Sequence, residues 1–145
     1  MGRKAFYVGG IYTVFGKHDE AIEFFENIVT NTNDIYTKAA SFNQLGQNYL
    51  ALGNYEKAIS YIQEQLTISQ AIQEIYGESE AFESLGTTFL AKGDLKQAEK
   101  NLRSAIRVKE SIRKKLGSKD LLKVSLFETQ IDTYNQLQKV LVQQN

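Results

Sequence analysis

The chain has 145 residues, and its 17 basic and 17 acidic side chains give a formal net charge of zero. It contains no Cys, no Pro, no Trp and one His, which excludes disulfides, thiolate nucleophiles and a His-rich metal site. A hydrophobic content of 42% is too high for a disordered tail and suits one folded domain. No apolar run approaches the roughly 18 residues that cross a bilayer, so we expect a cytoplasmic protein without a membrane partner.

Apolar residues recur at helical spacing along the chain, which predicts an all-α fold. The pairs Gly-Asn at 53–54 and Gly-Asp at 93–94 each combine a left-handed helix end with an N-cap residue for the next helix. We expect Gly77 and the loop 117–119 to separate successive helix pairs. In chain order the predicted helices cover residues 3–15, 18–31, 35–52, 55–75, 79–92, 95–116 and 120–143.

A set of landmarks recurs three times in the same order. Each copy has a hydrophobic residue followed by Gly, an aromatic residue three positions later, a second Gly, a small Ala and a large apolar residue. Small residues at these positions allow the two helices of a hairpin to approach closely. The three sets are Gly9, Tyr12, Gly16, Ala21 and Phe25; Gly46, Tyr49, Gly53, Ala58 and Ile62; and Gly86, Phe89, Gly93, Ala98 and Leu102.

These landmarks resemble the tetratricopeptide repeat (TPR) over nearly the whole chain. They depart from it at the opening Trp, which is replaced by Ala5, Phe42 and Phe82, and at the closing Pro, which is absent. The resemblance implies a right-handed α-solenoid of antiparallel helix pairs, with about three repeats and a terminal helix. It implies a single TPR domain over residues 1–145, with repeats at about 3–34, 35–77 and 79–117 and the terminal helix at 120–143.

The last predicted helix carries an apolar stripe that we expect to pack inward, consisting of Val124, Phe127, Ile131, Tyr134 and Leu141. An apolar helix face at this end also favours a homodimer through the C-terminal end. The segment 127–145 resembles the last repeats of bacterial, notably cyanobacterial, proteins with a CHAT domain downstream, which is a caspase-like protease fold. This second resemblance implies that the chain is part of a longer protein.

Catalysis by the chain itself is not predicted. His18 is the one imidazole, and we interpret it as a half-exposed residue at a helix start with no partner at a suitable spacing. The many Glu pairs are explained by helix propensity, and the glycines fit neither the dinucleotide nor the P-loop pattern. We therefore predict no enzyme activity, no cofactor and no metal site.

The zero net charge hides an uneven distribution. Residues 18–83 hold eleven acidic and two basic side chains, whereas residues 84–123 hold eleven basic and four acidic ones. Cations recur at helical spacing on the predicted helix 95–116. A solvated face is the simpler interpretation of this stripe, and nucleic acid is the less favoured partner. The candidates on this basic face are Lys96, Lys100, Arg103, Arg107 and Lys114.

The TPR resemblance implies that the first helix of each pair lines a concave groove that binds peptides. Amide and hydroxyl side chains in such a groove can bond the backbone of a peptide. The cationic clamp for carboxylate tails is absent, and Glu80 and Glu83 would repel such tails, so we expect a neutral or basic peptide. The groove candidates are Tyr7, Gly10, Thr13, Asn43, Gln44, Gln47, Glu83, Ser84, Thr87 and Gln136.

The favoured function is therefore a protein–protein interaction scaffold that binds a peptide or partner domain in the groove. Two alternatives remain open. The chain could be the regulatory TPR portion of a larger CHAT protease, or it could bind RNA or another anion through the basic helix 95–116.

Overall fold

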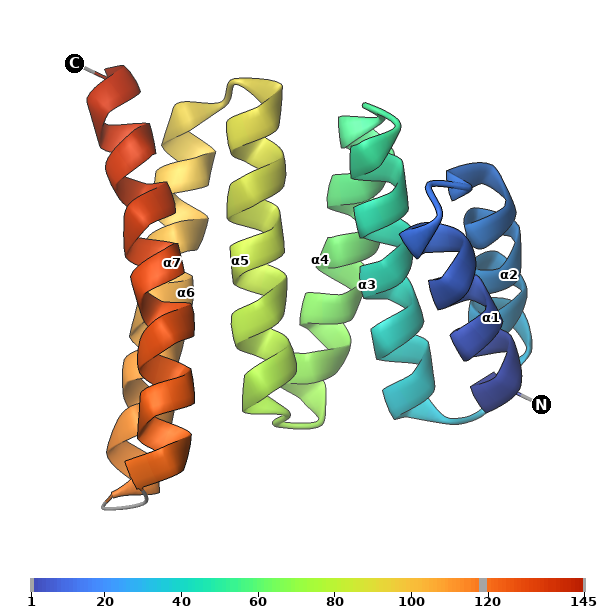
Figure 1. The fold of residues 1–145 in the computed structure, drawn as a ribbon, viewed down its shortest axis with the longest axis horizontal. Helices are drawn as coiled ribbons and strands as arrows, with labels where there is room; N and C mark the ends of the chain where they lie inside the picture. Colours follow the sequence, from blue (N-terminus) through green and yellow to red (C-terminus); the bar gives the residue numbers. More distant parts are fainter. Residues whose placement is uncertain (1, 118–119, 145) are drawn as a thin grey trace. The chain divides into compact units, whose positions relative to one another are not determined.

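The computed structural model describes residues 2–117 and 120–144, and it describes side chains for residues 3–117 and 126–144. This described part contains seven α-helices and no strand, which confirms the all-α prediction (Figure 1). The chain divides into two compact units, Met1–Gly77 (unit 1) and Glu78–Asn145 (unit 2). The helices are α1 (Gly2–Val14), α2 (His18–Asn31), α3 (Ile35–Ala51), α4 (Tyr55–Ala71), α5 (Ile75–Lys92), α6 (Leu95–Leu116) and α7 (Asp120–Gln144).

Glycine and a polar cap form the turns at residues 53–54 and 93–94, as predicted. Gly53 has a φ of 76°, a left-handed conformation that is costly for residues with a Cβ atom. The side chain of Asn54 then accepts a hydrogen bond of 3.3 Å from the backbone N–H of Lys57 in the first turn of α4. Asp94 caps α6 in the same way, by accepting a bond of 3.2 Å from the N–H of Gln97.

The boundary between α4 and α5 differs from the prediction, because both the end of α4 and the start of α5 come four residues earlier. Gln73, with a φ of 57°, turns the chain without a glycine. The carboxylate of Glu74 then accepts bonds from the backbone N–H groups of Tyr76 and Gly77, at 3.2 and 2.6 Å. Gly77 thus lies in the first turn of α5, buried against Ser69, and does not separate the helix pairs.

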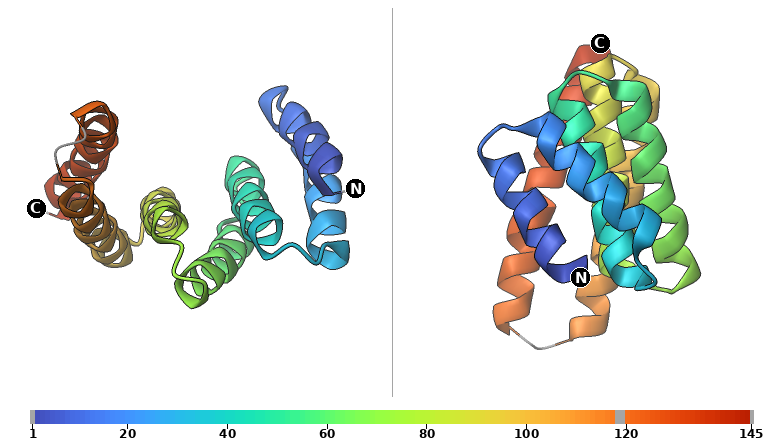
Figure 2. Two further views of the ribbon diagram at one scale, coloured as in Figure 1. Left: turned by 90° about the horizontal axis from the view of Figure 1, so that it is seen from below. Right: turned by 90° about the vertical axis from the view of Figure 1, so that its right-hand side faces the viewer.

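In unit 1, α1 and α3 form one layer and α2 and α4 form the other (Figure 2, left). The largest fully buried apolar side chains between these layers are Phe25, Leu45 and Ile62. Burial of each stabilises the fold by roughly 1.5–3 kcal/mol. Gly46 allows α3 to approach α4, because a Cβ atom there would lie 2.4 Å from Cγ1 of Ile62. The landmark Gly and Ala58 thus have the packing role that the sequence predicted.

Unit 2 repeats this close approach between α5 and α6. A Cβ atom on Gly86 would lie 2.6 Å from Cδ2 of Leu102, which is fully buried. The core continues onto α7, where Leu137 and Val140 join Leu102 and Ala98 in one buried apolar cluster. This cluster holds α7 against the preceding helix pair.

The inward face of α7 is not the predicted one. The predicted stripe residues Phe127, Ile131 and Tyr134 are 55%, 42% and 45% exposed, so the prediction that they pack inward is wrong. Leu141 of that stripe is half-buried against the apolar cluster, whereas the side chain of Val124 and the loop residues Ser118 and Lys119 lie outside the described residues. The inward residues are instead Gln130, Thr133, Leu137 and Val140. Thr133 faces inward because its hydroxyl accepts a hydrogen bond from the buried Lys109 of α6.

Candidate functional site

A hollow of about 530 Å³ is lined by α1 and α3 of unit 1. Its lining brings together four of the predicted groove residues, Tyr7, Gly10 and Thr13 from α1 and Gln44 from α3. A Cβ atom on Gly10 would meet nothing within 4 Å, so the hollow is open at that position. The rest of the lining is apolar and comes from Phe6, Ile11 and Val14 of α1 and from Phe15 in the turn that follows it.

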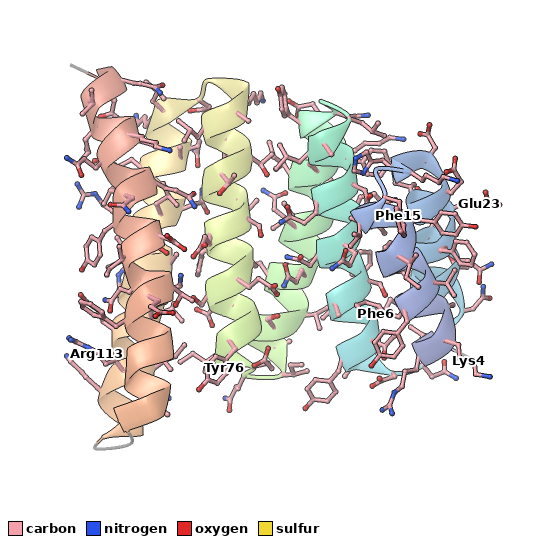
Figure 3. The ribbon with its side chains drawn as sticks, in the orientation of Figure 1. Lys4, Phe6, Phe15, Glu23, Tyr76 and Arg113 are labelled. Atoms are coloured by element: carbon pink, nitrogen blue, oxygen red, sulfur yellow. The ribbon has the colours of Figure 1, made fainter. Side chains whose placement is uncertain are left out.

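The α1 side of the hollow is the most exposed apolar surface of unit 1. Tyr7, Ile11, Val14 and Phe15 are 64%, 57%, 82% and 75% exposed, although each is large and apolar. These four residues will be called the α1 face. In Figure 3, Phe6 and Phe15 mark opposite ends of α1, with Lys4 at the same end as Phe6. Contiguous exposed apolar residues of this kind are typical of a surface that binds another molecule.

Cations border the α1 face. Arg3, Lys4 and Lys17 are exposed, and the sequence has no carboxylate among residues 1–17. Asp34, at the start of α3, is an acidic side chain that lies close enough to this border for the charge of Arg3 to act on it. Its pKa is lowered mainly by the hydrogen bond from the Thr37 hydroxyl and, to a smaller extent, by the charge of Arg3. The hollow is thus an apolar site whose border carries three cations, with Asp34 near Arg3.

A hydrogen-bond network fixes the polar wall of the hollow. The amide nitrogen of Asn48 donates to the Thr13 hydroxyl at 2.9 Å and to the Gln44 carbonyl at 2.8 Å, and the Thr13 hydroxyl donates to the Gly9 carbonyl. The Gln44 carbonyl can only accept a hydrogen bond, so the Asn48 atom next to it is the amide nitrogen. The amide oxygen of Asn48 therefore faces Nδ1 of His18, 2.8 Å away. That Nδ1 therefore carries a proton. His18 has a partner 30 residues along the chain, which helical spacing could not reveal.

A second network joins the other side of α3 to α2 and α4. The hydroxyls of Tyr49 and Tyr61 both donate to the Glu26 carboxylate, at 3.0 and 3.3 Å, and their rings stack 5.7 Å apart. Burial, together with the bond to Glu26, raises the pKa of Tyr49 to about 12, and the same causes raise the pKa of Tyr61. Lys57 lies over the Tyr49 ring at 5.1 Å. This cluster holds three helices together behind the hollow.

In unit 2, α7 occupies the surface of α5 where groove residues were predicted. Glu83 forms an ion pair with Lys109, whose side chain is only 8% exposed. The Lys109 ammonium also donates to the hydroxyl of Thr133 on α7 at 2.7 Å. Thr87 donates to the side-chain oxygen of Gln136, again on α7, at 2.7 Å. The predicted groove residues Glu83, Thr87 and Gln136 are therefore bonded to partners within the unit itself.

Of the remaining predicted groove residues, Asn43 and Ser84 are buried, whereas Gln47 is half-buried like Thr13 and Gln44. Asn43 is 6% exposed and its amide donates to the buried side-chain oxygen of Gln65 at 2.8 Å. Whether any of these side chains contacts a peptide stays a prediction.

The five cations of the predicted basic face are all exposed on α6. One of them, Arg103, forms an ion pair of 3.1 Å with Glu99 one turn earlier. The opposite side of the same helix is the buried one, where Lys109 and the apolar core residues lie. Counted by unit, unit 1 has eight acidic and five basic side chains, and unit 2 has nine acidic and twelve basic. The charge contrast between the units is therefore milder than the contrast between the sequence segments.

The chain combines repeat landmarks and antiparallel helix pairs with close helix approaches at Gly46 and Gly86. A sequence profile of the tetratricopeptide repeat family matches residues 37–111. The chain belongs to the tetratricopeptide repeat family. No curated protein sequence matches it.

Solved TPR structures share the fold at low sequence identity. The TPR-like repeats of a kinesin light chain protein from P. anserina superpose with a TM-score of 0.68 at 18% identity, covering 95% of this chain and 69% of that one. BtubC from P. vanneervenii superposes with a TM-score of 0.72 at 19% identity, covering 97% of this chain and 59% of that one. This TPR chain thus spans only part of each of these two proteins. At such identities the likeness is one of fold.

Metal and membrane sites were also sought in the described part of this TPR protein. Its described residues contain no cluster of His, Asp and Glu side chains that could hold a metal ion. None of its described helices combines the length and the apolar character needed to cross a bilayer.

Proposed function

We propose that this TPR protein is an interaction scaffold that acts in the cytoplasm and binds a peptide or partner domain in the hollow of unit 1. The observation that carries the proposal is the open α1 face beside Thr13 and Gln44. Its four large apolar side chains supply contact area, and the polar wall supplies donors and acceptors for a peptide backbone. Membership of a repeat family whose folds serve as binding scaffolds supports the same function.

The proposal allows a wider range of partner charge than the sequence indicated. The expectation of a neutral or basic peptide depended on the absence of a cationic clamp and on repulsion by Glu80 and Glu83. Glu83 is paired with Lys109, and the hollow of unit 1 is bordered by cations. We therefore extend the proposal to apolar segments of either charge, and an experiment that varies the charge decides between them.

A random-peptide library displayed on phage, panned against the full chain, tests this function. We expect the selected peptides to carry two or more large apolar residues. Their affinity, measured by fluorescence anisotropy, should fall at least tenfold in an Ile11→Asp variant. Versions of one peptide with flanking Lys or flanking Glu then report the preferred charge. Selected peptides that bind wild type and Ile11→Asp equally would exclude the hollow as the site.

Binding of RNA or another anion to α6 is a second candidate, because all five predicted cations are exposed there. Under this alternative, Glu substitutions at Lys100, Arg103 and Arg107 should abolish retention of the protein on immobilised RNA at low salt. Absence of retention by the wild type would end this alternative.

The predicted link to a CHAT protease depends on a resemblance alone, and sequencing the gene downstream of the codon for residue 145 tests it.

A further inference from the structure

Two exposed apolar surfaces of this chain have complementary charge. The first is the α1 face, bordered by Arg3, Lys4 and Lys17. The second lies on the outward side of α7 and consists of Phe127, Ile131, Tyr134 and Val142, which are between 42% and 67% exposed. These four residues will be called the α7 ridge. Within their own units these surfaces make few contacts, among them the edge-to-face contact of Tyr7 with Phe6 and the hydrogen bond of Tyr134 to Glu110.

The α7 ridge is an apolar stripe from Phe127 to Tyr134, with carboxylates beside it, and the exposed polar residues Asn135 and Gln138 separate that stripe from Val142. Its residues follow one another at intervals of four, three and eight positions, which places them on one side of a helix. Glu128 and Asp132 are exposed and stand next to Phe127 and Ile131 in the sequence, one turn apart. The ridge thus has two carboxylates beside its N-terminal half, whereas the charge of Arg113 on α6 acts on Tyr134 and Lys139 is exposed in the C-terminal half.

The ridge is also held outward by the bonds on the other side of α7. Thr133 is fully buried against Lys109, and Gln136 is bonded to Thr87, so the helix cannot rotate its apolar stripe inward without breaking both contacts. In addition, the Tyr134 hydroxyl donates to Glu110 of α6 at 3.0 Å. A pre-formed ridge loses little conformational freedom when a partner binds to it.

We propose that the hollow of unit 1 receives the α7 ridge of a second copy of this chain, in a head-to-tail contact. This inference rests on the proposed function, because it names the occupant of the same hollow. The stretch Tyr7–Phe15 spans roughly 12 Å along a helix, and the N-terminal part of the α7 ridge, Phe127–Tyr134, spans roughly 10 Å, so these two stretches match in length. With α1 and α7 parallel, Arg3 and Lys4 lie beside Glu128 and Asp132 of the other copy. Such a contact joins two different surfaces, so it generates chains or rings of copies rather than only pairs.

Sedimentation velocity of the full chain, from micromolar to near-millimolar concentration, tests the contact. We expect the wild type to form species beyond the dimer as concentration rises. Ile11→Asp breaks the α1 face and Ile131→Asp breaks the α7 ridge, and each should weaken association at least tenfold. Circular dichroism checks that both variants stay helical. Tyr36→Asp is the matched control, because Tyr36 is 62% exposed in the first turn of α3 and belongs to neither surface.

Mixing the two defective variants gives the sharpest result. The Ile11→Asp copy keeps its ridge and the Ile131→Asp copy keeps its α1 face, so the mixture should form a one-to-one heterodimer that does not grow further. Association that survives Ile11→Asp but is lost in Ile131→Asp would indicate a symmetric pairing of two α7 helices and would overturn the head-to-tail contact. So would a wild type that is monomeric at every concentration.

The peptide experiment separates this inference from the proposed function. If the wild type is monomeric but selected peptides still bind it and not the Ile11→Asp variant, the second copy is wrong as the occupant and the scaffold function stands. If neither peptides nor a second copy depend on Ile11, both proposals fail. If the second copy binds, its ridge should compete with the selected peptides, and Ile131→Asp should remove that competition.

Discussion

Unit 1 and unit 2 have the same repeat landmarks but differ in what covers their first helices. In unit 2, Glu83 and Thr87 of α5 are bonded to Lys109 on α6 and Gln136 on α7. In unit 1, the α1 face remains exposed beside Gln44. The landmarks determine how the two helices of a pair approach each other, but the next helix determines whether the surface of the first one is open. Repeats with the same landmarks can therefore present an exposed binding surface in one unit and a covered surface in the other.

The closed surface of unit 2 should depend most strongly on Lys109. Replacing Lys109 with Met leaves Glu83 and Thr133 without their buried cation, and we expect the free energy of unfolding to fall by about 3–5 kcal/mol. Urea unfolding followed by circular dichroism measures the loss, and hydrogen exchange should show that the α7 amides lose protection first.

A double variant provides the control for this prediction. Lys109→Met combined with Glu83→Leu removes both charges, and it should recover most of the lost stability because no buried charge is left unpaired. Equal stability of Lys109→Met and wild type would mean that the buried ion pair does not hold α7.

The network behind the open hollow of unit 1 should respond to alkaline pH. The pKa of Tyr49 is raised to about 12, mainly by burial and then by the Glu26 carboxylate. The neutral phenol is thus favoured in the folded state. Its contribution to stability is complete below about pH 10, the ordinary pKa of tyrosine, and is lost between about pH 10 and pH 12. The shift corresponds to roughly 2–3 kcal/mol.

Tyrosinate absorbance during a pH titration measures this effect. Exposed side chains such as Tyr7 and Tyr36 should ionise first, and Tyr49 should ionise at higher pH. Glu26→Gln removes the carboxylate and should lower the pKa of Tyr49. If Tyr49 ionised together with the exposed tyrosines, its burial between α2, α3 and α4 would be contradicted.

Two adjacent glycines of α1 distinguish the packed side of this helix from the open side. A Cβ atom on Gly9 would lie 2.8 Å from Cζ of Phe25, which is fully buried, whereas one on Gly10 would meet nothing within 4 Å. Gly9→Ala should therefore lower the free energy of unfolding by about 1–3 kcal/mol. Gly10→Ala should raise it by roughly 0.5–1 kcal/mol, because Ala favours the helix. Thermal unfolding of the two variants compares them, and equal shifts would show that the hollow side of α1 is packed.

Much of the fold could be predicted from the sequence, because the landmark Gly and Ala residues are needed where two neighbouring helices pack closely. Gly46 and Ala58 had the predicted role, as did the caps Asn54 and Asp94. The start of α5 was missed because Gln73 adopts a conformation that sequence rules assign to glycine.

The candidate site was harder to predict, because its contacts join residues far apart in the sequence. Tyr7, Thr13 and Gln44 were found to line one hollow, but the bonds of His18 to Asn48 and of Lys109 to Thr133 span 30 and 24 residues. Helical periodicity also selected the more apolar side of α7 as the inward one. It could not show that the buried Lys109 requires the polar side instead.

Photo-crosslinking tests the central claim, that unit 1 has the open binding surface and unit 2 the closed one. Benzoylphenylalanine is introduced in place of Gln44, in the hollow, or in place of Gln136, which is bonded to Thr87. Each full chain is then irradiated with a peptide selected by panning on the wild type. We expect strong cross-linking from position 44 and little from position 136. Strong cross-linking from position 136 alone would contradict it.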